Sequence, residues 1–303
     1  MEDSIFIRRL RDALAADDLA DTTRARVIMD LQTYERWHHE TAGQPLDPDD
    51  LAITSVDLAE FRSHLLRKWQ PGTVTRCFAS LRKTLRLLAP ALLVSLRMPK
   101  IPQPVKPAPS GFTKKERLAL LRAACQLDPR DRAIVTLAMM TGARSSSIAN
   151  AKLSKLEINA RSGSIEYDVT KGNRTYSVPL NAEAREALTA WLKERVPVDN
   201  DWLFVSERFP FEKLTRWSIH DIFHRRLTKF LPADLAKRIK GGHMVGRHGL
   251  ARLLLEQGVP LPDVAAILNH SSVATTANIY CRPSEQDLRG HLERAVGEEP
   301  EDD

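Results

Sequence analysis

Apolar residues recur at the spacing of an α-helix through the first hundred residues of the chain. In one segment they fall at i, i+4, i+7 and i+10, which places them on one face of an amphipathic helix. These residues are Val27, Leu31, Tyr34 and Trp37. A second stripe of the same kind comprises Phe78, Leu81, Leu85 and Leu88. We therefore expect an entirely helical N-terminal region.

Proline, glycine and acidic residues divide the chain. Asp57 is a candidate N-cap for a helix over residues 58–69, which Pro71-Gly72 would end. Five prolines then stand at nearly alternate positions between residues 98 and 110. Prolines at this density fit neither a helix nor a sheet ladder, and they favour an extended connector. The predicted domains are residues 1–98, a linker over 99–110, a second domain over 111–297 and an acidic tail over 298–303.

The pattern of the second domain differs from that of the first. Thr113-Lys-Lys-Glu116 has the form of a capping box that opens a helix, and the apolar run 134–140 predicts a buried helix that ends at Thr141-Gly142. Residues 163–170 and 174–179 predict two short strands joined by a turn at 171–173. We expect the remainder to be helical apart from glycine-marked breaks. The expected fold class is mainly α: a helical N-terminal domain and an α+β second domain with a small antiparallel sheet.

The composition predicts the cellular compartment of the protein. Three widely spaced cysteines in 303 residues indicate a reducing compartment and argue against a disulfide framework or a zinc knuckle. The apolar runs are too short to cross a bilayer, and the N-terminus lacks the basic start of a secretory signal. We therefore expect a cytoplasmic protein without a membrane partner.

Positive charge is concentrated in one segment. The net charge is +6, and no Asp or Glu occurs between Phe61 and Lys100. A block of one sign is typical of a phosphate-facing surface, although a solvated helix face has the same appearance. The candidate DNA contacts in this block are Arg62, Lys68, Arg76, Arg82, Lys83 and Arg86.

The second domain contains the side chains needed to cleave a phosphodiester without a metal. Displacement at phosphorus needs cations at the non-bridging oxygens and an acid for the leaving oxygen. Arg144 and Arg247 offer planar forks of donors that stay charged at any working pH. Lys171, at the tip of the predicted hairpin, is a flexible point charge suited to protonating the leaving 5′ oxygen.

A nucleophile and proton carriers complete the set. Tyr280 can attack phosphorus and hold the broken strand as a phosphotyrosyl ester, which conserves the bond energy for resealing without ATP. His243 and His270 can bond the phosphate or relay the tyrosine's proton. No glycine-rich nucleotide loop is present, so we expect no cofactor and no nucleotide partner.

These motifs together resemble the tyrosine recombinase, or phage integrase, family, in its simple two-domain Xer-like form. The similar segments, in order between about Gly111 and Pro283, are Thr141-Gly-Ala-Arg144, Thr170-Lys-Gly-Asn173, Arg247-His248, Leu254-Leu-Glu-Gln-Gly258, Ile267-Leu-Asn-His270-Ser-Ser and Ile279-Tyr280. The resemblance implies a site-specific DNA recombinase that works through a 3′-phosphotyrosyl intermediate. It further implies a core-binding N-terminal domain, a clamp on double-stranded DNA and a homotetramer on paired DNA sites. The implied catalytic set is Arg144, Lys171, His243, Arg247, His270 and Tyr280.

The chain departs from the family pattern at two positions. In the family, the second histidine usually stands three residues before its arginine, whereas here that position is Met244 and His243 stands four before Arg247. Spacings of three and four share a helix face, so either register keeps the pair together. The family also commonly has an acid three residues after the first arginine, where this chain has Ser147. Arg144 would then be held by another partner.

Two other functional interpretations stay open at this point. Residues 254–280, with Gly258 at a turn, have the rhythm of a helix-turn-helix, which suits a non-enzymatic DNA-binding regulator. A type IB topoisomerase-like enzyme would use the same chemistry to relax DNA without exchanging partners. His220 and His224 have the i, i+4 spacing of a zinc-protease helix but no obvious third ligand, so we assign no metal.

Overall fold

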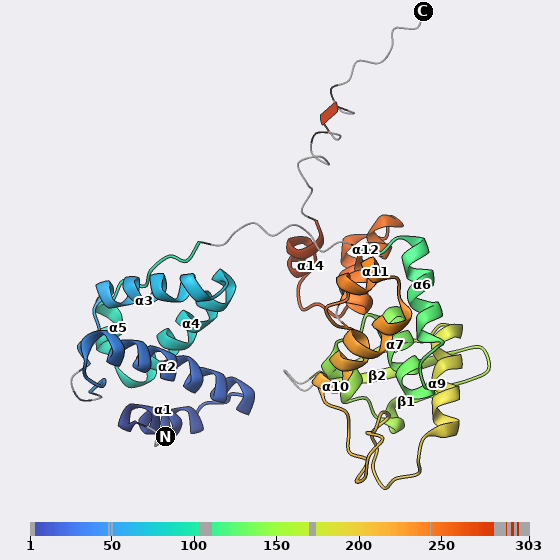
Figure 1. Cartoon of the computed structure of the whole chain (residues 1–303), viewed down its shortest axis with the longest axis horizontal. Helices are drawn as coiled ribbons and strands as arrows, with labels where there is room; N and C mark the ends of the chain where they lie inside the picture. Colours follow the sequence, from blue (N-terminus) through green and yellow to red (C-terminus); the bar gives the residue numbers. More distant parts are fainter. Residues whose placement is uncertain are drawn as a thin grey trace, which may run out of the picture. The chain divides into compact units, whose positions relative to one another are not determined.

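The computed structural model divides the chain into two compact units, Met1–Lys106 and Pro107–Asp303 (Figure 1). It describes residues 4–47, 49, 51–102, 111–169, 174–242 and 244–281, with single positions at 289, 292, 293 and 296. The hairpin tip with Lys171, the position of His243, most of the linker and the acidic tail lie outside the described residues. The predicted domain boundaries stay a prediction.

The first unit is helical throughout its described residues. Both predicted apolar stripes face its core: Leu31, Tyr34 and Leu85 are fully buried, and the edge of Tyr34 meets the ring of Phe61 with centroids 5.0 Å apart. Aromatic burial of this kind supplies most of the packing energy of a small helical domain. The helices are α1 (Ile5–Ala15), α2 (Asp21–Ala42), α3 (Ser55–Lys68), α4 (Pro71–Leu88) and α5 (Pro90–Ser95).

Two predicted helix boundaries in this unit are wrong. The N-cap of α3 is Thr54, and Asp57 lies at the third helical position, where its carboxylate accepts the Thr54 N–H in a capping box. A capping box satisfies two backbone donors instead of one, so it is preferred over an Asp cap alone. At the other end, α3 stops at Lys68, and Pro71 occupies the first turn of α4, where a missing N–H costs nothing.

The second unit combines helices with one antiparallel sheet, so the predicted fold class is confirmed. Its buried central helix is α7, and the predicted capping box at Thr113 and Glu116 opens α6. The longer helices and the strands are α6 (Lys114–Ala124), α7 (Pro129–Thr141), β1 (Leu156–Ile158), β2 (Gly163–Val169), β3 (Arg174–Pro179), α9 (Ala182–Glu194), α12 (Gly249–Glu256), α13 (Leu261–Ile267) and α14 (Val273–Tyr280). Shorter helices are α8 (Ser145–Ala149), α10 (Arg216–Asp221) and α11 (Ala233–Arg238), with π-helices at Ile222–Arg226 and Met244–His248 and 3₁₀ turns at Leu153–Lys155 and Leu227–Phe230.

The sheet has the order β1-β2-β3, and β1 was not expected from the sequence. The predicted pair β2 and β3 is in register, with Ile165 opposite Val178 and Tyr167 opposite Tyr176. β1 is only three residues long and pairs Leu156 with Ile165, so it is too short to show an alternating pattern. The prediction that the remainder is helical apart from glycine-marked breaks is also wrong. The segment between α9 and α10 contains no helix. It packs against α9, where Leu203 O accepts a 2.9 Å hydrogen bond from Trp191 Nε1.

Within the described residues, every helix is too short or too polar to span a bilayer.

Candidate active site

Arg144 stands at a corner between two helices of the second unit. α7 ends at Thr141, and Gly142 takes the left-handed conformation (φ +64°) that turns the chain away. This positive φ favours glycine, and a Cβ at Gly142 would also lie 2.8 Å from the end of the Leu268 side chain, which would have to shift. Arg144 is then the N-cap of α8, with its guanidinium exposed and one N–H directed at Asn269 O, 3.4 Å away. This carbonyl takes the place of the missing acid at Ser147.

Arg247 lies in the π-helix Met244–His248 and is buried, with 8% of its surface exposed. Its guanidinium donates to Gly142 O at 3.2 Å and to Leu268 O. The π-helix packs closely against α7 at Gly246, because a Cβ at this position would lie 2.6 Å from Ala138 O. Burial lowers the pKa of Arg247 to about 10, and the neighbouring charge of Arg144 adds to the effect. Two arginines thus lie close together without a carboxylate on either in the described part of the chain.

His270 is fixed by the turn after α13. Asn269 adopts a positive φ of 47°, which asparagine tolerates, and the His270 N–H returns to Ala265 O at 2.9 Å. The ring Nδ1 lies 2.6 Å from the hydroxyl of Thr276, which is itself fully buried on α14. Burial lowers the pKa of His270 to about 4, with further contributions from Arg247 and Arg144. The imidazole is therefore neutral at physiological pH.

Tyr280 is the last residue of α14 and is 3% exposed. Its hydroxyl lies 2.6 Å from Nδ1 of His248, and the two rings meet edge to face with centroids 5.5 Å apart. Burial raises the pKa of Tyr280 to about 12, while the charge of Arg247 acts in the opposite direction. Thr276 and Tyr280 are four residues apart on one face of α14. Each meets the Nδ1 of a different histidine.

The structure thus brings together four of the six residues predicted for catalysis: Arg144, Arg247, His270 and Tyr280. His248 joins them, although no separate role was predicted for it. It directly follows Arg247, but nothing in the spacing of the chain reveals that it meets Tyr280 thirty-two residues later. That contact depends on how α14 packs against the π-helix, which only the fold shows.

The six candidate DNA contacts of the first unit differ in their partners within the protein. Arg76 pairs with the buried Asp30, and Lys83 lies 2.6 Å from Asp17. Arg62 donates to Lys100 O at 3.1 Å, and the Lys68 ammonium lies 3.4 Å from His64. Arg82 and Arg86, four residues apart on α4, are exposed and line a cavity of about 500 Å³. In the described residues these two side chains face solvent.

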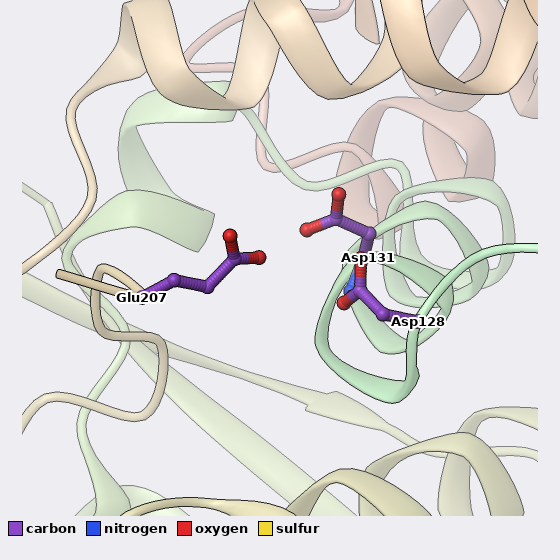
Figure 2. A group of neighbouring side chains, drawn as sticks. All are labelled: Asp128, Asp131 and Glu207. Atoms are coloured by element: carbon purple, nitrogen blue, oxygen red, sulfur yellow. The ribbon is translucent and has the colours of Figure 1, made fainter.

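A second pair of arginines, far from Tyr280 in sequence, is neutralised by acids. Asp128 and Asp131 begin α7, and the carboxylate of Glu207 faces them (Figure 2). Arg130 contacts Asp131 and Glu207, each at 2.7 Å. Arg226, from the π-helix Ile222–Arg226, contacts Asp131 at 2.7 Å, Glu207 at 3.3 Å and Asp128 at 3.6 Å. The three carboxylates are thus occupied by two guanidinium groups, and the cluster ties three segments of the unit together.

The histidine pair His220 and His224 has ring centroids 5.3 Å apart. Nδ1 of His224 lies 3.0 Å from Ile239 O. Holding a backbone carbonyl is an ordinary structural role for such a ring.

Comparisons with known proteins agree with this arrangement. The model of the phage integrase family matches residues 111–287. The tyrosine recombinase XerD of Lacticaseibacillus casei is 28% identical over 280 residues, which cover 89% of this chain and 90% of that protein. The tyrosine recombinase XerA of Pyrococcus furiosus is 32% identical over 205 residues, which cover 66% of this chain and 65% of that protein. The XerH recombinase, solved in a post-cleavage complex with a palindromic difH substrate, has the same fold at 20% identity (TM-score 0.70, covering 96% of this chain and 94% of that one).

The chain belongs to the phage integrase family. It is a tyrosine recombinase, an enzyme that cleaves and rejoins DNA at specific sites. The resemblance stated from the motifs is therefore confirmed, and a non-enzymatic regulator is excluded.

Proposed function

We propose that Tyr280 attacks a DNA phosphodiester and holds the strand as a 3′-phosphotyrosyl ester, with Arg144 and Arg247 on the non-bridging oxygens. The observation that carries this proposal is a buried arginine beside a buried tyrosine, with only backbone carbonyls as partners of its guanidinium in the described chain. A buried arginine without a carboxylate partner is strongly stabilised when an anion enters the site. His270, neutral and oriented by Thr276, adds a hydrogen bond to the phosphate.

Lys171 and His243 complete the proposed set from positions outside the described residues. Lys171 protonates the leaving 5′ oxygen, as its place at the hairpin tip suggests. The π-helix supports the role of His243, which directly precedes it in the sequence. A π turn takes one residue more than an α turn, because its hydrogen bonds run from i to i+5. The extra residue compensates for the spacing of four between His243 and Arg247 where the family usually has three.

The partner we propose is double-stranded DNA, bound by a homotetramer on two paired sites. Exchange between two duplexes breaks four strands, and each broken strand is held by one tyrosine, so four copies of this chain are needed. Arg82 and Arg86 of the first unit contribute salt-dependent contacts to phosphates. The fold likeness to XerH solved with DNA, and to a lambda integrase dimer solved on a core site, supports this proposal.

The test uses a DNA duplex with a nick beside the cleavage point, so that the released fragment diffuses away and religation fails. We expect the native chain to accumulate a covalent protein–DNA adduct and Tyr280→Phe to form none. Tyr176→Phe is the matched control, because Tyr176 lies in the same unit with its hydroxyl 3.4 Å from Ser147. An adduct that persists in Tyr280→Phe overturns the nucleophile.

The same assay decides the register of the second histidine. His243→Ala should slow adduct formation by about 10²-fold or more, as expected for loss of a phosphate or proton-transfer partner. Met244→Ala should leave the rate near that of the native chain. The opposite order would assign the position to residue 244.

A further inference from the structure

The hydroxyl of Tyr280 has a histidine partner outside the six residues of the proposed catalytic set. Nδ1 of His248 lies 2.6 Å from the phenolic oxygen, which is hydrogen-bonding distance for a strong bond. The ring of His248 also meets the tyrosine ring edge to face, so the contact is fixed by packing as well as by the bond. Tyr280 packs with Leu250, Ala251, Val264 and Leu268 in one apolar cluster. The pair is therefore positioned by α12, α13 and α14 together.

The tyrosine needs a proton acceptor at this place. A phenol buried among apolar side chains stays protonated, and burial raises the pKa of Tyr280 to about 12. Attack on phosphorus therefore requires the proton to leave as the new bond forms. A phenol is a better donor than acceptor, so its hydroxyl donates to Nδ1 of a neutral imidazole.

His270 is poorly suited to this task. Its Nδ1 is already engaged by the Thr276 hydroxyl at 2.6 Å. Burial and the charges of Arg247 and Arg144 lower its pKa to about 4, so it binds a proton weakly. Among the described residues, His248 is the one whose imidazole touches the reacting oxygen.

We infer that His248 is the general base that takes the proton of Tyr280 during strand cleavage and returns it during resealing. This inference rests on the proposed role of Tyr280. The O–H bond of Tyr280 breaks, its proton passes to Nδ1 of His248, and the phenolic oxygen bonds to phosphorus. The bond from phosphorus to the 5′ oxygen breaks, and that oxygen takes a proton from Lys171. In resealing, the 5′ hydroxyl attacks, the phenolic oxygen leaves, and His248 gives its proton back.

Positive charge lies close to the histidine that takes the proton. Arg247 directly precedes His248 on the π-helix, and Arg144 acts on the same site. The bound phosphate offsets these charges. The proton stays on His248 for the life of the intermediate and returns to the phenolic oxygen in resealing.

The experiment measures single-turnover cleavage of the nicked duplex by the full chain, at saturating DNA, between pH 6 and pH 9. The deciding variant is His248→Asn, because the asparagine amide can bond the tyrosine hydroxyl but cannot accept its proton. We expect a loss of about 10²–10⁴-fold at pH 7. The native rate should level off toward the alkaline end of this range, whereas the variant's rate should rise about tenfold per pH unit, because hydroxide must then remove the proton.

Two further variants separate this role from simple positioning. His248→Ala opens space at the ring, and added imidazole should restore part of its rate while leaving Tyr280→Phe inactive. Thr276→Val disturbs the other histidine contact on the same face of α14, and its pH profile should keep the native shape. A His248→Asn chain with the native rate and profile, or a His248→Ala chain that is faster than native, overturns the general base. Adduct formation by Tyr280→Phe would instead overturn the nucleophile on which the inference rests.

Discussion

Two pairs of arginines in the second unit show how differently the same side chain is used. Arg130 and Arg226 both contact Asp131 and Glu207, and Asp131 between them is fully buried. Arg144 and Arg247 have only backbone carbonyls as partners among the described residues. The first pair is neutralised by the protein itself. The second pair keeps its positive charge, and we propose that a DNA phosphate supplies the missing anion.

Burial alone does not separate the two pairs. Arg130 is 5% exposed and Arg247 is 8% exposed, so both guanidinium groups are removed from water. The difference is the partner: burial lowers the pKa of Arg247 to about 10, whereas no carboxylate offsets that effect in the described chain. We therefore take the lack of a carboxylate partner among the described residues as the feature that separates the proposed phosphate-binding arginine from the structural one.

The largest effect on folding is expected where a buried pair is broken. Asp131→Asn removes the buried carboxylate that contacts both Arg130 and Arg226, and it leaves the half-exposed Glu207 as the carboxylate they still share. Breaking a buried ion pair on one side costs about 3–5 kcal/mol, because the remaining charge stays out of water. We expect the chemical unfolding of the catalytic unit to shift by that amount. Adduct formation per folded molecule should stay close to native.

The control for this variant is Glu207→Gln, which changes a carboxylate that is 58% exposed in the same cluster. Exposed pairs contribute about 0–1 kcal/mol, so a much smaller shift is expected. Equal losses in the two variants would show that the cluster is not organised around Asp131.

The largest effect on activity is expected at Arg247, which has no carboxylate partner among the described residues. Arg247→Lys keeps the charge but removes the planar fork that can hold Gly142 O and a phosphate oxygen together. We expect strand cleavage to slow by about 10²–10³-fold, as for the loss of one preorganised donor. Arg132→Lys, in a surface pair with Glu186 on the same unit, is the matched control and should be near native. A fast Arg247→Lys chain would remove Arg247 from the phosphate site.

Local sequence signals predicted the parts of this site but not their contacts. The capping box at Thr113, the helix stop at Gly142 and the β2–β3 pair depend on neighbouring residues, and all three are as predicted. The bond between His248 and Tyr280 depends on packing between segments far apart in the chain, which no periodicity records. The choice of Thr54 over Asp57 as N-cap was missed for a smaller reason, because both residues are good caps and the capping box decides between them.

A smaller effect is expected from the pH dependence of stability. The pKa of His270 is lowered to about 4 in the folded chain, from an ordinary value of 6.5. Above pH 6.5 the ring is neutral in both states, and as the pH falls toward 4 only the unfolded chain takes up the proton. The free energy of unfolding should therefore fall across this window. His270→Gln should lose less stability between pH 7 and pH 5 than the native chain does, as measured by urea unfolding at the two pH values. Parallel losses would mean that the proton is taken up elsewhere.

The smallest effect is expected in the first unit, where the arginines of α4 differ in whether a carboxylate contacts them. Arg82 and Arg86 are exposed on α4, whereas Arg76 on the same helix pairs with the buried Asp30. Each phosphate contact contributes about 0.9 to the slope of log affinity against log salt for duplex DNA. Arg82→Gln and Arg86→Gln should each reduce that slope by about one, measured by DNA titration at several salt concentrations. Arg76→Gln should leave the slope unchanged and lower thermal stability, because its charge is already matched inside the protein and Asp30 would lose its partner.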